Sequence, residues 1–218
     1  WQSVRDGKGC VLAEVAVTTG TLTCVDDTLK QAIDIRSNGF RALGAEFVQF
    51  DDAGGIYYTG TTQSDSGYPK SVLRRSTAAG KTDLVNDQMT LTDFMVLGNG
   101  SVLVSGTSSA TGAKWTRRIS PTGVLSGLLS KLCSLRRFPD GNVFANCDNS
   151  WYRYDATTNA MVDASLTGVT ALSILGALSD GSVVSASNST FSRVYPTQST
   201  IATSQVTTVQ ALSLIHIS

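Results

Sequence analysis

The residues best suited to chemistry in this sequence are two adjacent pairs of carboxylates, Asp26-Asp27 and Asp51-Asp52. Neighbouring carboxylates can do general acid–base work when their surroundings keep one of them protonated and the other ionised. Both pairs lie at expected turns, where aspartate side chains commonly accept hydrogen bonds from nearby backbone N–H groups. We therefore expect these carboxylates to cap turns and not to catalyse a reaction.

Histidine chemistry is nearly absent, because the chain contains one histidine, His216, close to its end. One histidine in this position supplies no Ser-His-Asp arrangement and no histidine metal site. The sequence also lacks a P-loop, a dinucleotide fingerprint and a calcium loop, so we expect neither a metal nor a cofactor. Residues 212–218 also resemble translated sequencing-adapter read-through. On that interpretation His216 is not native, and we expect the chain to be cut at both ends.

Polar side chains that could bind a partner are concentrated in the longest polar connection, residues 62–70. Two further charged residues fall in the connections that correspond to it later in the chain. Loops on a rigid scaffold are where binding residues tend to gather. The alternative is a solvated loop without a partner. The candidate binding residues are Gln63, Asp65, Tyr68, Lys70, Lys114 and Asp148.

The four cysteines form two pairs with the same spacing, Cys10 with Cys24 and Cys133 with Cys147. The second pair lies almost symmetrically about the expected turn at Asp140-Gly141. Residues opposed on antiparallel strands have Cα atoms close enough for a disulfide. We therefore predict disulfides, with reduced core cysteines as the alternative. An even number of cysteines favours an oxidising compartment.

The elements that would position these residues follow a repeat. Its clearest copy is Phe138–Cys147, an apolar residue, an Asp-Gly turn and a short strand, and Leu97–Gly106 is another. Asp-Gly and Asn-Gly pairs suit two-residue hairpin turns because both positions tolerate positive φ. The segment 27–35 has some helical spacing, but the repeat makes it a turn and an outer strand. The turn glycines Gly54, Gly100, Gly141 and Gly181 follow one another by 46, 41 and 40 residues.

A second column supports the same period, because an arginine stands at one position of the third strand in four copies. An apolar residue, usually aromatic, precedes each arginine by two positions and shares its face of the strand. We expect each arginine stem to cover that neighbour, and we expect Trp115, Trp151 and Phe191 to be buried between adjacent sheets. The arginines are Arg74, Arg117, Arg153 and Arg193.

These columns resemble bacterial β-propeller repeat proteins, without matching the motifs of WD or kelch repeats. A period of about 40 residues with short strands is typical of propeller blades. The resemblance implies an all-β fold, a partial β-propeller of about four to five blades, each a four-stranded antiparallel sheet. The expected blades are 1–42, 43–88, 89–129, 130–168 and 169–206, and 207–218 is the start of another blade or an artefactual tail.

The charge balance and the length of the apolar runs argue against two classes of partner, nucleic acids and membranes. The 17 basic and 17 acidic residues cancel, so nothing favours nucleic acid, and no apolar run is long enough to span a membrane. We expect a non-catalytic scaffold of a secreted, periplasmic or surface-anchored bacterial protein that binds a protein or a glycan. The alternative is a fragment of a propeller hydrolase or lyase whose catalytic residues lie in missing blades. The first strands, which would line its channel, offer Glu46, Asp93, Arg136 and Arg137.

Overall fold

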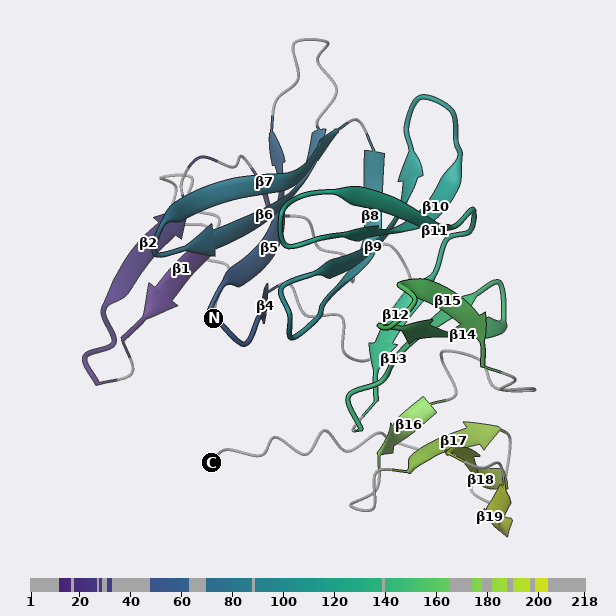
Figure 1. Ribbon diagram of the computed structural model, residues 1–218. Helices are drawn as coiled ribbons and strands as arrows, with labels where there is room; N and C mark the ends of the chain where they lie inside the picture. The colour runs from purple at the N-terminus through teal and green to yellow at the C-terminus, as the bar shows by residue number, and fades with distance from the viewer. Residues whose placement is uncertain are drawn as a thin grey trace. The chain divides into compact units, whose positions relative to one another are not determined.

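The computed structural model has an all-β fold, and none of the residues that it describes lies in a helix (Figure 1). This confirms that the fold is all-β, as expected from the sequence. The chain forms two compact units, Trp1–Leu135 and Arg136–Ser218, and the division between them falls within one strand. The described residues are 12–16, 18–26, 28, 31–32, 48–62, 70–87, 89–138, 140–164, 174–177, 182–187, 190–196 and 199–203.

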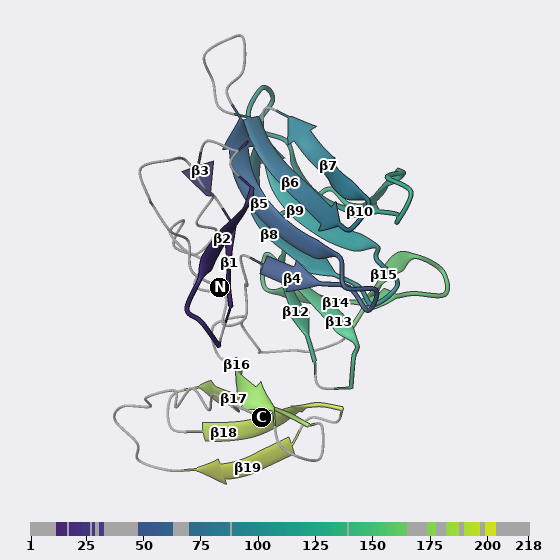
Figure 2. The ribbon, with the colours of Figure 1, turned by 90° about the vertical axis from the view of Figure 1, so that its left-hand side faces the viewer.

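The first part of the chain forms two antiparallel sheets. One is a hairpin of β1 (Leu12–Val15) and β2 (Leu22–Asp26). The other has five strands, and Figure 2 shows β5, β6 and β7 side by side within it. Its members are β3 (Gln31–Ala32), β4 (Val48–Phe50), β5 (Ile56–Thr62), β6 (Lys70–Thr77) and β7 (Gly80–Asp87).

Three four-stranded antiparallel sheets follow, and in each the strands are neighbours in chain order. The first contains β8 (Met89–Val96), β9 (Val102–Ser108), β10 (Lys114–Ile119) and β11 (Leu125–Leu129). The second contains β12 (Ser134–Arg137), β13 (Val143–Cys147), β14 (Ser150–Asp155) and β15 (Ala160–Asp163). The third contains β16 (Ile174–Ala177), β17 (Val183–Ser187), β18 (Thr190–Tyr195) and β19 (Ser199–Thr203).

The strand β3 corrects one expectation. The segment 27–35 was expected to supply an outer strand of the first repeat, but β3 pairs with β5 of the next sheet, Gln31 opposite Thr61. β4 also pairs with β5, further along it. The position normally filled by one first strand is therefore shared by two short strands. Periodicity within the chain could not reveal this, because pairing between strands depends on tertiary contacts.

The turn glycines have the expected positive φ, but the turns are not the expected two-residue hairpins. Gly54, Gly100 and Gly141 have φ of 79°, 77° and 83°. In the Gly100 turn, Leu97 N–H donates to Ser101 O at 2.7 Å and Gly100 N–H donates to Leu97 O at 2.8 Å. This pattern encloses three residues, with only the glycine in the left-handed region, as in a hairpin with a glycine bulge. A two-residue turn with positive φ at both positions does occur at Asp148-Asn149.

Side chains tie the first strands of successive sheets together within Trp1–Leu135. Gln49 of β4 donates from Nε2 to Phe94 O and accepts from Val96 N–H, both at 2.8 Å. Asp93 of β8 accepts a hydrogen bond from Leu135 N–H of β12 at 2.8 Å. Such bonds satisfy the outward backbone groups of an edge strand, which would otherwise be costly to bury.

The apolar core is built from residues of neighbouring sheets, as the repeat predicts. One buried cluster contains Tyr57 and Leu73 of the five-stranded sheet together with Phe94 and Trp115 of the next sheet. In Arg136–Ser218, Trp151 packs with Phe138, Phe144, Val183 and Val194. The expected burial of Trp115 and Trp151 is confirmed, while the Phe191 side chain lies outside the described residues.

The predicted disulfide between Cys133 and Cys147 is present. Cys147 is the last residue of β13, and Cys133 directly precedes β12, the strand beside it. Cys24 is also disulfide-bonded, but its predicted partner Cys10 lies outside the described residues.

Candidate functional site

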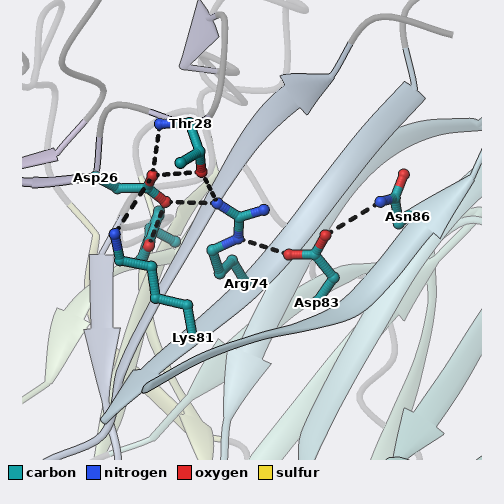
Figure 3. Close-up of polar contacts among 7 residues, drawn as sticks. Asp26, Thr28, Arg74, Lys81, Asp83 and Asn86 are labelled. Atoms are coloured by element: carbon teal, nitrogen blue, oxygen red, sulfur yellow. Dashed lines mark hydrogen bonds and ion pairs between the residues drawn. The ribbon is translucent and has the colours of Figure 1, made fainter. Parts of the chain in front are cut away.

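The densest group of charged side chains in the described part of the chain surrounds Asp26, the last residue of β2 (Figure 3). The end of β2 places this carboxylate beside β6 and β7 of the five-stranded sheet. Arg74 lies on β6, Lys81 on β7 and Tyr58 on β5. Residues that are far apart in the chain therefore meet where the β1–β2 hairpin contacts the next sheet.

Both oxygens of the buried Asp26 carboxylate are fully used. Oδ2 accepts hydrogen bonds from the Tyr58 hydroxyl at 2.6 Å and from Arg74 Nη1 at 2.8 Å. Oδ1 accepts from Thr28 N–H at 2.8 Å and from Thr28 Oγ1 at 2.7 Å. Lys81 Nζ lies 3.7 Å from the same oxygen. Asp26 thus caps its own turn, as expected, but it also forms a buried ion pair that the sequence did not predict.

The Arg74 guanidinium joins this carboxylate to a second one. Its Nε donates to Asp83 Oδ1 at 2.5 Å, and Asp83 Oδ2 accepts from Asn86 Nδ2 at 3.1 Å. Arg74 also hydrogen-bonds Thr28 Oγ1. The Arg74 side chain is only 11% exposed. The arginine is therefore held between strands of two sheets.

The pKa values of Asp26, Arg74 and Tyr58 are all shifted away from neutral pH. Burial by itself raises the pKa of Asp26, but hydrogen bonds from Tyr58, Thr28 and Arg74 outweigh it and hold the pKa well below its usual range. The hydrogen bond to Asp83 raises the pKa of Arg74 further, and burial raises the pKa of Tyr58. An efficient general acid or base has a pKa near the working pH. The cluster is consequently suited to structural bonding and not to proton transfer.

A second buried carboxylate, Asp51, has a similar role. Its Oδ1 accepts from Gly55 N–H at 2.7 Å, and its Oδ2 accepts from the Tyr57 hydroxyl at 2.9 Å and from Arg75 Nη2 at 2.8 Å. Tyr57 also hydrogen-bonds the carbonyl of Gly100, in the turn of the next sheet, at 3.2 Å. This confirms that Asp51 caps a turn and shows that it also orients a contact between sheets.

The structure describes three of the six predicted binding residues. Lys70 begins β6 and is half-buried, and the exposed Lys114 begins β10. Each therefore starts the third strand of its own meander, on corresponding connections of two successive sheets. The exposed Asp148 occupies the β13–β14 turn, with φ of 52°. Gln63, Asp65 and Tyr68 lie outside the described residues.

The first-strand residues considered for catalysis differ in their surroundings. Asp93 is buried and bonds to the backbone of the next first strand. Arg136 is buried as well, whereas Arg137 is exposed. Glu46 lies outside the described residues. Asp93 thus serves packing between sheets.

The arginine column divides into different roles. The Arg117 guanidinium lies over the Trp115 ring, 4.7 Å from its centroid, as expected for a stem that covers its neighbour. Arg74 instead forms the ion pairs described above. Its partner Asp26 lies 48 residues earlier in a different sheet, so no local pattern could have revealed the pair. The repeat spacing predicted the position of Arg74 on its strand, but it did not predict that Arg74 pairs with Asp26.

Among the described residues, no group of three or more His, Cys, Asp or Glu side chains is arranged to hold a metal ion. In the same part of the chain, no helix is long and apolar enough to cross a membrane. The sequence matches no protein-family model and no curated protein.

Proposed function

We propose that this chain is part of a non-catalytic β-propeller that acts as a binding scaffold outside the cytoplasm. The observation that best supports this proposal is how the buried carboxylates are bonded. Asp26, Asp51 and Asp93 all bond to groups that fix turns or link sheets. Carboxylates committed in this way are poorly suited to acid–base work on a substrate.

The propeller arrangement is supported by topology and by the bonds between first strands. Each four-stranded sheet is a meander in chain order. Gln49 and Asp93 both reach the first strand of the following sheet. Side-by-side first strands are what blades around a common axis require. The location outside the cytoplasm is supported by the Cys133–Cys147 disulfide, since such bonds persist mainly in oxidising compartments.

We place the binding surface on the connections between the second and third strands. Lys70 and Lys114 stand at corresponding ends of two such connections in Trp1–Leu135. The turns at the other ends of these strands are tight and organised by backbone bonds, so they offer fewer side chains to a partner. The partner is a protein or a glycan.

A glycan array tests this proposal, combined with turnover assays on the glycans that bind. We expect saturable binding without turnover. We also expect binding to be at least about tenfold weaker in a Lys70→Ala/Lys114→Ala variant. This corresponds to a loss of about 1.4 kcal/mol of binding free energy. Arg153→Ala, which removes an exposed cation outside these connections, is the matched control and should bind like the unchanged chain. Cleavage of any bound glycan would contradict the non-catalytic proposal.

If the array shows no binding, the same three proteins are immobilised and probed with acidic and neutral peptide libraries. Loss of peptide binding in the double variant alone would assign the surface to a protein partner. Equal binding by all three proteins would remove Lys70 and Lys114 from the site.

A further inference from the structure

Two successive sheets in Trp1–Leu135 end in the outer strands β7 and β11, and these two strands differ in charge. β7 and β11 each end their sheet, so each has one edge that pairs with no described strand. Natural proteins commonly protect such edges with charged side chains. β7 carries Lys81, Asp83 and Asp87. β11 carries no charge, and neither does any residue from Ile119 to Ser130.

Apolar exposure is concentrated at the same edge. Among the described residues, the large apolar side chains that are exposed are Phe50, Val124 and Leu125. Val124 and Leu125 are adjacent at the start of β11 and are 61% and 49% exposed. Further along the strand, the position of a side chain at Gly127 meets no atom within 4 Å. The face of the sheet is therefore open at Gly127, and the edge of β11 pairs with no described strand.

The backbone of β11 also points hydrogen-bonding groups toward that edge. Ser120 N–H donates to Val124 O at 2.8 Å, and the next pairs are Ile119 with Leu125, and then Arg118 with Ser126. Because antiparallel pairs alternate between bonded and non-bonded, the N–H and C=O groups of Leu125 face away from β10. Those of Gly127, opposite Arg117, face the same way.

We propose that β11 is a docking edge for a second copy of this chain, which pairs β11 with β11 in antiparallel orientation. The strand is suited to itself, since a neutral strand meets no like charge when it faces its own copy. A copy would satisfy the outward groups of Leu125 and Gly127 and cover the apolar side chains at positions 124 and 125. β7 is less suited to such pairing, because it carries a lysine and two aspartates, of which Lys81 and Asp83 already form ion pairs within the same chain.

Sedimentation over a concentration series tests this pairing. We expect the unchanged chain to shift from its 22.9 kDa monomer to a species of twice that mass. Leu125→Lys should remain monomeric, because it puts a charge in place of an exposed apolar side chain that the second copy would cover. Ala110→Lys adds the same charge at an exposed position of the β9–β10 connection and should still dimerise. Circular dichroism verifies that both variants fold.

Hydrogen–deuterium exchange identifies the surface. The amides of residues 124–129 should exchange more slowly as the concentration rises, while those of β7 should not change. A chain that stays monomeric throughout the series would overturn the proposal. A dimer that leaves 124–129 unprotected, or one that Leu125→Lys does not weaken, would overturn it as well.

Discussion

Arg74 and Asp26, 48 residues apart in the chain, form an ion pair of 2.8 Å between strands of two different sheets. The Asp26 side chain is fully buried and that of Arg74 nearly so. A pair removed from water in this way is weak evidence of net stabilisation, but breaking it leaves an unpaired buried charge. The pair therefore favours the one position of β2 in which Asp26 contacts Arg74, because any other position would leave a buried charge unpaired.

The first prediction concerns this pair. Arg74→Ala should lower the free energy of unfolding by about 3–5 kcal/mol, because Asp26 loses its closest cation while it stays buried. Asp83→Asn removes the more exposed carboxylate partner of Arg74 and should cost less than about 1 kcal/mol. Urea denaturation measures both. If Asp26→Asn and Arg74→Ala are additive in the double variant, the two side chains are not coupled.

The second prediction concerns acid stability. Burial raises the pKa of Asp51, but bonds from Gly55, Tyr57 and Arg75 lower it overall, and the pKa of Asp26 is lowered as well. A carboxylate with a lowered folded-state pKa stabilises the fold above its unfolded pKa of about 4. That contribution is lost as pH falls from about 4 toward the folded-state pKa, because the unfolded chain takes up the proton first.

Urea denaturation at pH 7 and pH 3 would measure this loss. In Asp26→Asn the stability should fall less between the two values, since one titrating group has been removed. The variant should already be less stable at pH 7. A fall as large as that of the unchanged chain would show that Asp26 contributes nothing to the acid sensitivity.

The repeated features of the fold were predictable from the sequence. The positive φ of Gly100 and the burial of Trp115 follow from turn chemistry and strand periodicity, both of which are local. The pairing of β3 with β5 and of Asp26 with Arg74 was not predictable, because these contacts join distant segments. Periodicity aligns equivalent residues of different repeats, but it does not say which residues of neighbouring sheets touch.

The third prediction concerns the core of Arg136–Ser218. Trp151 is 2% exposed, and its ring centroid lies 6.4 Å from that of Phe138. Trp151→Ala should cost about 3–5 kcal/mol, because the surrounding side chains can fill only part of the cavity. Thr157→Ala, at an exposed turn position of the same unit, should change stability by no more than about 0.5 kcal/mol. Similar small effects of both substitutions would mean that the Trp151 site collapses without strain.

The last prediction concerns the disulfide between Cys133 and Cys147, which closes a loop of about 15 residues. A cross-link of this length is expected to stabilise a fold by about 3 kcal/mol, mainly by restricting the unfolded chain. Cys24 also forms a disulfide, so a reductant acts on more than one bond. The informative comparison is therefore between the unchanged chain and Cys133→Ser/Cys147→Ser, each with and without reductant. The reductant should destabilise the unchanged chain by about 3 kcal/mol more than the variant. Equal losses would show that this bond adds no stability, which would also weaken the argument for an oxidising compartment.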